Sequence, residues 1–241
     1  MCGRYGSTRS TAALAERFVA TPVEEAGDWA PSWNVAPTRD VRAVIERPDQ
    51  GRLVVPLRWG LVPSWAKNPS IGSRQINARA ETVATAPAYR NAIVRHRCLI
   101  PADGFYEWRR IDDGTKRGRR QPFWFARSDG DVIALAGLRE TWTDAEGRLL
   151  RTCTIVTTGA NADVADVHDR MPVVLEPGTW DQWLDPERKD AAALRVLLVP
   201  AQDGTLTRHA VSDRVNKPEQ DGPDLIEPVE EIDPNGQARL L

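Results

Sequence analysis

The second residue of the chain is a cysteine, Cys2, and it is followed by Gly3. Methionine aminopeptidases remove an initiator Met before a small side chain, so we expect Cys2 to carry a free α-amine. An amine and a thiol on adjacent carbons can condense with an aldehyde, first to an imine and then to a five-membered thiazolidine. Alternatively, the thiol is the nucleophile and the α-amine is its base. Both routes need an exposed sulfur, and a nearby cation such as Arg4 would favour the thiolate. The alternative is a cysteine buried as a small hydrophobic residue.

Further polar residues stand in segments that are otherwise apolar or turn-forming. Asn77 begins the segment NARAET, Glu107 lies between two aromatic residues, and His168 opens HDRMP. A carboxylate flanked by aromatic side chains is expected to be partly desolvated, which raises its pKa toward a useful acid–base range. Arg170 follows His168 by two positions, so the two side chains share a face in an extended segment. Taken singly, such a Glu is more often solvent-facing and such a His more often structural.

The elements that would hold these residues are mostly strands. Apolar patterns bounded by turn residues predict strands at 41–46, 52–58, 97–108 with a central bend, 122–127, 131–138, 151–158 and 196–201. Helical patterns cover 10–20, 85–95 and 187–195, the first with Ser10 or Thr11 as its N-cap. Trp180 and Trp183 stand at helical spacing and are expected to pack in the core. Because strands outnumber helices and do not alternate with them, we expect a single α+β domain over 1–216, built on a mostly antiparallel sheet or barrel.

Composition narrows the class of protein. The 241 residues are 41% hydrophobic and 27% charged, which is typical of soluble globular proteins. No apolar run approaches the ~18 residues of a membrane span, and the N-terminus lacks the apolar region of a secretory signal. The three cysteines, Cys2, Cys98 and Cys153, show no C-x-x-C spacing, which argues against a disulfide framework and a zinc site. We therefore expect a cytoplasmic protein with reduced thiols.

Charge is unevenly distributed along the chain. The net charge is −2, yet residues 201–241 hold 4 basic and 9 acidic side chains. We expect residues 217–241, acidic and rich in proline, to form a loosely ordered tail. Elsewhere nearly all cations are Arg, which suits contacts with phosphates, although codon bias gives the same composition. The 9 Trp residues exceed what a core of this size needs, so some could be exposed stacking surfaces.

Seven segments together resemble the SRAP family (SOS response-associated peptidase fold), whose members sense abasic sites and crosslink to single-stranded DNA. The segments are MCGRY, WNVAPT, RWGLVPSWA, INARAET, RCLIPADGFYEW, AGL and HDRMPVVL. They follow the family's order over roughly residues 1–216. The probability that all of them match in this order by chance is negligible beside that of a single motif match. The acidic tail lies outside the resemblance.

The resemblance implies a mechanism and a set of site residues. The α-amine of Cys2 would form a Schiff base with the C1′ aldehyde of a ring-opened abasic site, and the thiol would then close a thiazolidine. Asn77 would position the N-terminal residue, Glu107 would shuttle protons, and His168 would assist ring opening at the sugar oxygen. The implied phosphate contacts are Arg4, Arg79 and Arg170, and the implied wedge and stacking surface is Asn34, Pro37 and Trp65.

The resemblance also bears on activities and partners. It implies peptidase activity, at least in releasing the protein's own N-terminal residue, and strand cleavage by β-elimination is a further output to consider. The expected partner is single-stranded DNA containing abasic sites, with no cofactor, no metal and no membrane. A monomer suffices for this mechanism.

Three other functions remain open at this stage. Class II glutamine amidotransferases also begin Met-Cys-Gly, but a chain of this length lacks a second domain to accept ammonia. A non-covalent single-strand binding module would leave Cys2 incidental. A cysteine protease acting on other proteins would need a substrate pocket that the sequence does not reveal.

Overall fold

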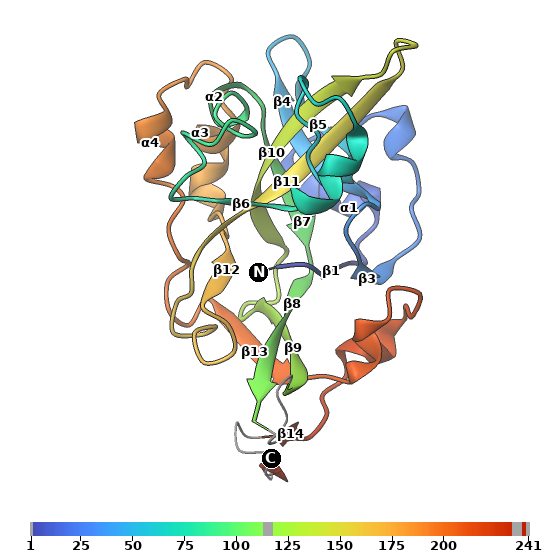
Figure 1. The fold of residues 1–241 in the computed structure, drawn as a ribbon, viewed down its shortest axis with the longest axis vertical. Helices are drawn as coiled ribbons and strands as arrows, with labels where there is room; N and C mark the ends of the chain where they lie inside the picture. The colour runs from blue at the N-terminus through green and yellow to red at the C-terminus, as the bar shows by residue number, and fades with distance from the viewer. Residues whose placement is uncertain (1, 113–117, 233–237, 240–241) are drawn as a thin grey trace.

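The computed structural model describes residues 2–112, 118–232, 238 and 239, and antiparallel strand pairing organises them (Figure 1). The larger sheet has eight strands in the order β12-β11-β10-β7-β4-β5-β2, with β6 paired to β11. Its strands are β2 (Thr21–Pro22), β4 (Asp40–Arg47), β5 (Gly51–Trp59), β6 (Asn77–Arg79), β7 (Arg97–Ala102), β10 (Ile133–Thr143), β11 (Leu149–Gly159) and β12 (Arg170–Pro172). A parallel contact between β5 and β11 joins the ends of the run β5-β4-β7-β10-β11 and so closes a barrel.

A second sheet has five strands in the order β13-β9-β8-β1-β3. Its strands are β1 (Tyr5–Ser7), β3 (Ser32–Val35), β8 (Gly104–Ile111), β9 (Arg119–Arg127) and β13 (Leu206–Ala210), and a small pair is formed by β14 (Glu231–Ile232) and β15 (Ala238–Arg239). β1 is paired on both sides, because Tyr5 lies opposite Val35 of β3 and opposite Phe105 of β8. The start of the chain is therefore held in the middle of the molecule (Figure 1).

Short helices cover the outer face of the barrel. They are α1 (Thr11–Phe18), α2 (Ala92–Arg95), α3 (Trp180–Leu184) and α4 (Ala191–Arg195), with 3-10 turns η1 (Glu24–Ala26), η2 (Pro69–Arg74), η3 (Pro177–Thr179), η4 (Asp213–Asn216) and η5 (Pro223–Ile226). Phe18, Ile93 and Trp183 belong to a buried cluster with Val44 and Val54 on the barrel's outer side. Across the described ranges, no helix is both long and apolar enough to span a bilayer.

The two faces of the barrel strands follow the period-2 pattern of a strand. In β4, Val41, Ala43 and Ile45 belong to the interior core, whereas Val44 between them packs in the outer cluster. The expected α+β fold with a mostly antiparallel, barrel-like sheet is confirmed. The predicted N-cap is confirmed as well, because the Ser10 hydroxyl accepts a hydrogen bond from the Ala13 amide at 3.1 Å.

Two predicted elements are wrong. The helix expected over 85–95 is reduced to α2, and the strand expected over 196–201 is absent, since that described segment continues from α4 as turns. Leu194 and Leu198 are both buried, whereas Val199 is exposed. A spacing of four places the two leucines on one face of a helical turn, so packing of the leucines overrides the β-propensity of the valines.

The C-terminal segment, residues 218–232, is more ordered than its composition suggests. Leu225 is fully buried, and the Asp221 carboxylate accepts a hydrogen bond from the Trp33 amide at 2.7 Å. Arg109 pairs with Glu231 at 2.8 Å. The acidic side chains therefore meet donors on the domain, and the expectation of a loosely ordered tail is wrong for this segment. Residues 233–237, 240 and 241 lie outside the described part of the chain.

Candidate active site

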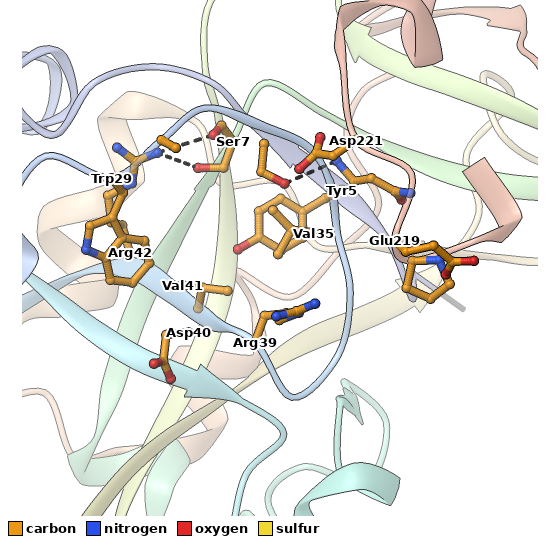
Figure 2. Close-up of a pocket in the computed structure, with 14 residues that line it drawn as sticks. Tyr5, Ser7, Trp29, Val35, Arg39, Asp40, Val41, Arg42, Glu219 and Asp221 are labelled. Carbon is orange, nitrogen blue, oxygen red and sulfur yellow. Dashed lines mark hydrogen bonds between the residues drawn. The ribbon is translucent and has the colours of Figure 1, made fainter. Parts of the chain in front are cut away.

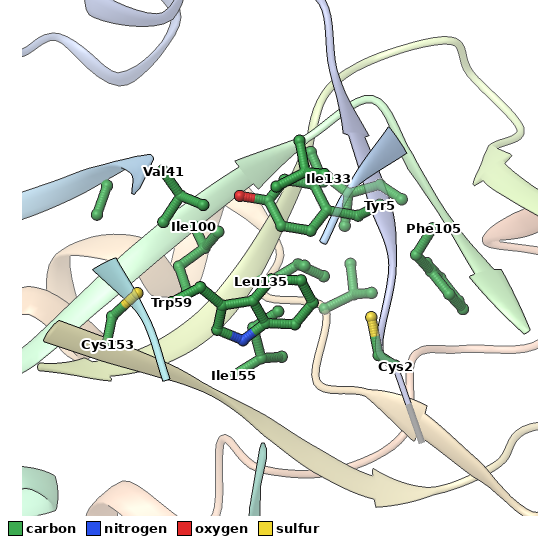
Figure 3. Packing of buried hydrophobic residues seen from close by; sticks show 14 of the residues in the cluster. Cys2, Tyr5, Val41, Trp59, Ile100, Phe105, Ile133, Leu135, Cys153 and Ile155 are labelled. Atoms are coloured by element: carbon green, nitrogen blue, oxygen red, sulfur yellow. The ribbon is translucent and has the colours of Figure 1, made fainter. Parts of the chain in front are cut away.

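Cys2 lies in the core at the point where the two sheets meet. Its side chain has 0% exposure and belongs to the same interior cluster as Tyr5, Trp59 and Phe105 (Figure 3). Burial raises the pKa of the thiol well above its usual range, and the negative charge of Glu107 raises it further. Of the two states that the sequence left open for Cys2, exposed or buried, the structure shows the buried one, because the β1 pairing holds the start of the chain inside the molecule. The sulfur is a protonated thiol at neutral pH, and it needs a base before it can attack.

Asn77 is hydrogen-bonded to Cys2, the residue that would react. Its side-chain Nδ2 donates to the backbone carbonyl of Cys2 at 2.8 Å. β6 fixes this amide, because Asn77 pairs with Ile155 of β11 and its own carbonyl accepts from the Tyr89 hydroxyl at 3.2 Å. The buried Oδ1 of Asn77 has no hydrogen-bond partner among the described residues. That acceptor is free to hold a donor on the chain terminus or the substrate.

Glu107 is a buried carboxylate on β8. It lies opposite Phe123 of β9, and residues opposite one another in an antiparallel ladder share a face, so the carboxylate packs beside that ring. Burial raises the pKa of Glu107 to about 7, and the charge of Asp169 also raises it. Tyr106 and Trp108 point to the other face of β8, so the aromatic residues that desolvate Glu107 are not its neighbours in sequence.

His168 faces Glu107 from the segment before β12. Its Nε2 lies 3.8 Å from a carboxylate oxygen of Glu107. The Arg170 amide donates to Nδ1 at 2.9 Å, which leaves the proton of the neutral ring on Nε2, toward Glu107. Asp169 also approaches Nδ1, at 3.0 Å, and that contact becomes attractive only when the ring is protonated. Burial lowers the pKa of His168, so the neutral form dominates at pH 7.

Two arginines lie on either side of β11 beside this cluster. Arg79 of β6 is opposite Thr157, and Arg170 of β12 is opposite Gly159. Arg79 is exposed, whereas Arg170 makes a bidentate ion pair with Glu81 at 2.5 and 3.0 Å. The guanidinium of Arg170 also donates to the Thr157 carbonyl at 2.8 Å. Sequence reasoning did not single out Glu81 as the partner of Arg170, although Glu81 lies within the NARAET segment.

A family model described as SOS response associated peptidase (SRAP) matches residues 1–218. The chain belongs to the SRAP family. Among curated relatives, abasic site processing protein YoqW of Bacillus subtilis (strain 168) is 41% identical over 227 residues, which cover 94% of this chain and 99% of that protein. Abasic site processing protein YedK of Escherichia coli (strain K12) is 33% identical, with 95% of this chain and 100% of that protein covered.

Solved structures support the same fold. A protein from Bacteroides thetaiotaomicron superposes with a TM-score of 0.84 at 22% identity, over 95% of this chain and 100% of that chain. A protein from Bordetella bronchiseptica gives a TM-score of 0.71 at 26% identity, over 88% and 100% of the two chains. This SRAP chain therefore shares its overall fold with these proteins.

The residues expected to contact DNA fall into two groups. Trp65 is 60% exposed and is free to stack, and Pro37 is partly exposed. Arg4 and Asn34 are instead engaged inside the protein. Arg4 donates to Asn34 Oδ1 and to the Val215 carbonyl, both at 2.8 Å.

Asn34 also ties the C-terminal segment to β3. Its Nδ2 donates to the carbonyls of Lys217 and Gln220, at 3.1 and 2.7 Å. In this structure the pair Arg4 and Asn34 has a positioning role, and contact with a phosphate stays a prediction that requires these bonds to rearrange.

Proposed function

We propose that this SRAP protein senses abasic sites in single-stranded DNA and binds them covalently through Cys2 after removal of Met1. One observation carries the proposal. Cys2, Asn77, Glu107 and His168 come from separate parts of the chain and form one connected cluster, with a carboxyl group whose pKa is raised to about 7. The names of its relatives, abasic site processing proteins, agree with it.

The first half of the reaction is imine formation. The α-amine of Cys2 adds to the C1′ aldehyde to give a carbinolamine, and loss of water then gives the protonated imine. The departing hydroxyl needs a proton, which Glu107 in its protonated form can supply. Asn77 holds the Cys2 carbonyl and so fixes the direction of the amine. His168 presents its Nε2 proton on the same side, where it can assist opening of the closed sugar ring.

The second half is ring closure. The Cys2 sulfur bonds to the imine carbon, the C=N bond becomes a C–N bond, and the nitrogen ends as a secondary amine. The sulfur must lose its proton, since burial keeps the thiol protonated. Glu107 has just become a carboxylate by giving up its proton, so it can accept this one. A group with a pKa near the working pH serves best in both directions.

The DNA backbone would bind to arginines beside the four residues Cys2, Asn77, Glu107 and His168. Arg79 and Arg170 would hold the phosphates that flank the lesion, with Arg4 as a third contact if it leaves Asn34. Phosphate contacts position a strand without reading its sequence. Trp65 would stack on a base, with Asn34 and Pro37 beside it in the wedge, and stacking accepts any base. All the proposed groups belong to one chain, so a monomer suffices.

The crosslink is the direct test. Wild-type protein and a single-stranded oligonucleotide with one abasic site should give a band that survives SDS and heat, and intact DNA should give none. Cys2→Ala should lose that band. Cys98→Ala also removes a buried thiol, but one outside the group formed by Cys2, Asn77, Glu107 and His168, so it should retain the band. A heat-stable adduct of equal yield with Cys2→Ala and no reductant would refute thiazolidine formation.

A second activity follows from the family's description as a peptidase. We propose that the same cluster can release Met1 from Cys2, since Asn77 is hydrogen-bonded to the Cys2 carbonyl and the charge of Glu107 acts on the Cys2 thiol. β-Elimination of the DNA strand from the imine is a third outcome of the same intermediate. Intact-mass measurement of wild type and Glu107→Gln, produced in cells lacking methionine aminopeptidase activity on this site, separates self-release from ordinary processing. Equal Met1 retention in both proteins would contradict self-release.

A further inference from the structure

A strained turn, residues 36–39, lies between β3 and β4. Its third residue, Thr38, has a backbone φ of 69°, in the left-handed region. The Arg39 amide donates to the Ala36 carbonyl at 3.4 Å, so Pro37 and Thr38 are the central residues of the turn. Proline second and a positive φ third is the pattern of a type II turn, whose third residue is normally Gly. A β-branched residue is a genuine outlier in this conformation.

The surrounding strands hold Thr38 in this conformation. The Thr38 amide donates to the Trp59 carbonyl at 2.8 Å, and the Trp59 amide donates to the Arg39 carbonyl at 2.9 Å. Both backbone groups of Trp59, at the end of β5, are therefore bonded to the turn. Val35, just before the turn, and Arg39, its last residue, line one cavity with Tyr5 (Figure 2). A sparsely populated backbone conformation persists only where its neighbours fix it, and such residues gather at functional sites.

Trp59 connects the turn to the candidate active site. Its side chain belongs to the interior cluster that contains Cys2 (Figure 3). Its indole donates at 2.9 Å to the carbonyl of Ile76, the residue before Asn77. The second residue of the turn is partly exposed and the third is exposed. The turn therefore presents a surface to solvent whose position is fixed relative to Cys2.

We propose that Thr38 sets the selectivity of this protein for single-stranded over duplex DNA, because it keeps the turn rigid when DNA binds. The proposal rests on the proposed function, in which Pro37 belongs to the wedge. Proline fixes its own φ, and the β-branched side chain of Thr38 is stiff. A single strand can bend around a fixed obstacle, whereas a duplex resists bending. Gly would accept the positive φ without strain, but it would leave the turn free to move aside for a duplex.

The test compares variants on two substrates, a single-stranded oligonucleotide with one abasic site and the same lesion centred in a long duplex. Thr38→Gly should crosslink the single strand at a rate close to that of wild type. Its ratio of single-strand to duplex rates should fall by about tenfold, which corresponds to about 1.4 kcal/mol in the barrier. Thr38→Val keeps the β-branched shape and removes only the hydroxyl, so it should retain the wild-type ratio.

Val19 provides a matched control. Among the described residues it is the only other non-glycine with a positive φ, 51°, and it is exposed at the end of α1. Val19→Gly relieves similar strain outside the turn and outside the interior cluster, so it should leave the ratio unchanged. For both Gly variants, relief of strain offsets the entropic cost of Gly. Their melting temperatures should therefore lie within about 4 °C of wild type.

Three results would overturn the role of Thr38 while leaving the crosslink itself intact. They are a folded Thr38→Gly protein that keeps the wild-type ratio, a Thr38→Val protein that loses it, and a Val19→Gly protein whose ratio falls as far as that of Thr38→Gly. Equal wild-type rates on both substrates would also refute the proposal. A wild-type protein that crosslinks neither substrate would refute the proposed function, and this proposal with it.

Discussion

Replacement of Glu107 by Gln should slow the crosslink and stabilise the protein at the same time. Gln keeps the shape of the side chain and removes its titration. If Glu107 is both the acid for imine formation and the base for ring closure, the crosslinking rate should fall by ~10²–10⁴-fold. Removing a negative charge should leave binding to intact single-stranded DNA equal or slightly stronger.

The stability change follows from the same pKa. Burial raises the pKa of Glu107 from 4.5 to about 7, which corresponds to roughly 3 kcal/mol against the charged carboxylate in the folded state. Below pH 4.5 the carboxyl is neutral in both states and adds no cost. As the pH rises toward 7, unfolding lets the group ionise, so wild type loses up to about this amount of stability, and the loss persists above pH 7. Glu107→Gln should therefore match wild type near pH 4.5 and exceed it at pH 8.

Single-turnover crosslinking rates between pH 5.5 and 9, with thermal melts at the same pH values, test both effects. The wild-type rate should decline above pH 7, because imine formation needs the protonated carboxyl, which itself becomes the carboxylate that ring closure needs. Glu107→Gln should lose this decline above pH 7, and the exposed control Glu227→Gln should retain it. A folded Glu107→Gln protein that reacts at the wild-type rate would remove Glu107 from the mechanism, and one that is less stable than wild type at pH 8 would assign it a structural role.

Further predictions concern the groups around Glu107. His168→Ala should slow crosslinking most on closed-ring abasic sites and least on a substrate with a permanently open aldehyde; equal slowing on both would contradict a role in ring opening. Arg79→Ala should weaken binding of all single-stranded sequences alike and lower the salt slope by about 1, as one lost phosphate contact requires. Glu81→Gln frees Arg170 from its bidentate partner, so binding should strengthen and the salt slope should steepen; no change in either would show that Arg170 does not reach phosphate. Trp65→Ala should narrow the difference between single-stranded and duplex substrates, and an unchanged ratio of crosslinking rates would count against a wedge.

Much of the barrel could be predicted because its strands obey simple rules. Val41, Ala43 and Ile45 alternate with outward residues, and their hairpin partner β5 follows a short turn, so local pattern and long-range pairing agree. The strand prediction for 196–201 was wrong because the β-propensity of its valines and the spacing of its leucines favour different structures. Only the tertiary contacts available to the segment decide between them. The C-terminal segment misled for a related reason, since composition does not reveal that Arg109 provides a partner for Glu231.

The structure brings the predicted residues Cys2, Asn77, Glu107 and His168 together, but the surroundings of two of them differ from what local sequence suggests. Glu107 was singled out for its aromatic neighbours in sequence, yet Phe123, a residue on the next strand, packs beside it. The sequence left open whether Cys2 is exposed or buried, and pairing of β1 on both sides buries it. Neither fact can be read from local sequence, because both depend on which strands become neighbours. The ion pair of Arg170 with Glu81 was hidden for the same reason, because its partners lie far apart in the chain.

The central claim is that both the amine and the sulfur of Cys2 bond to the C1′ carbon of an abasic site. Tandem mass spectrometry of the crosslink, after protease and nuclease digestion and treatment with a thiol alkylating reagent, tests it most directly. The account predicts an N-terminal peptide beginning at Cys2 that carries the sugar with loss of one water and takes up no alkyl group at its sulfur. An adduct on any other residue, or a Cys2 adduct whose thiol is still alkylated, would contradict it.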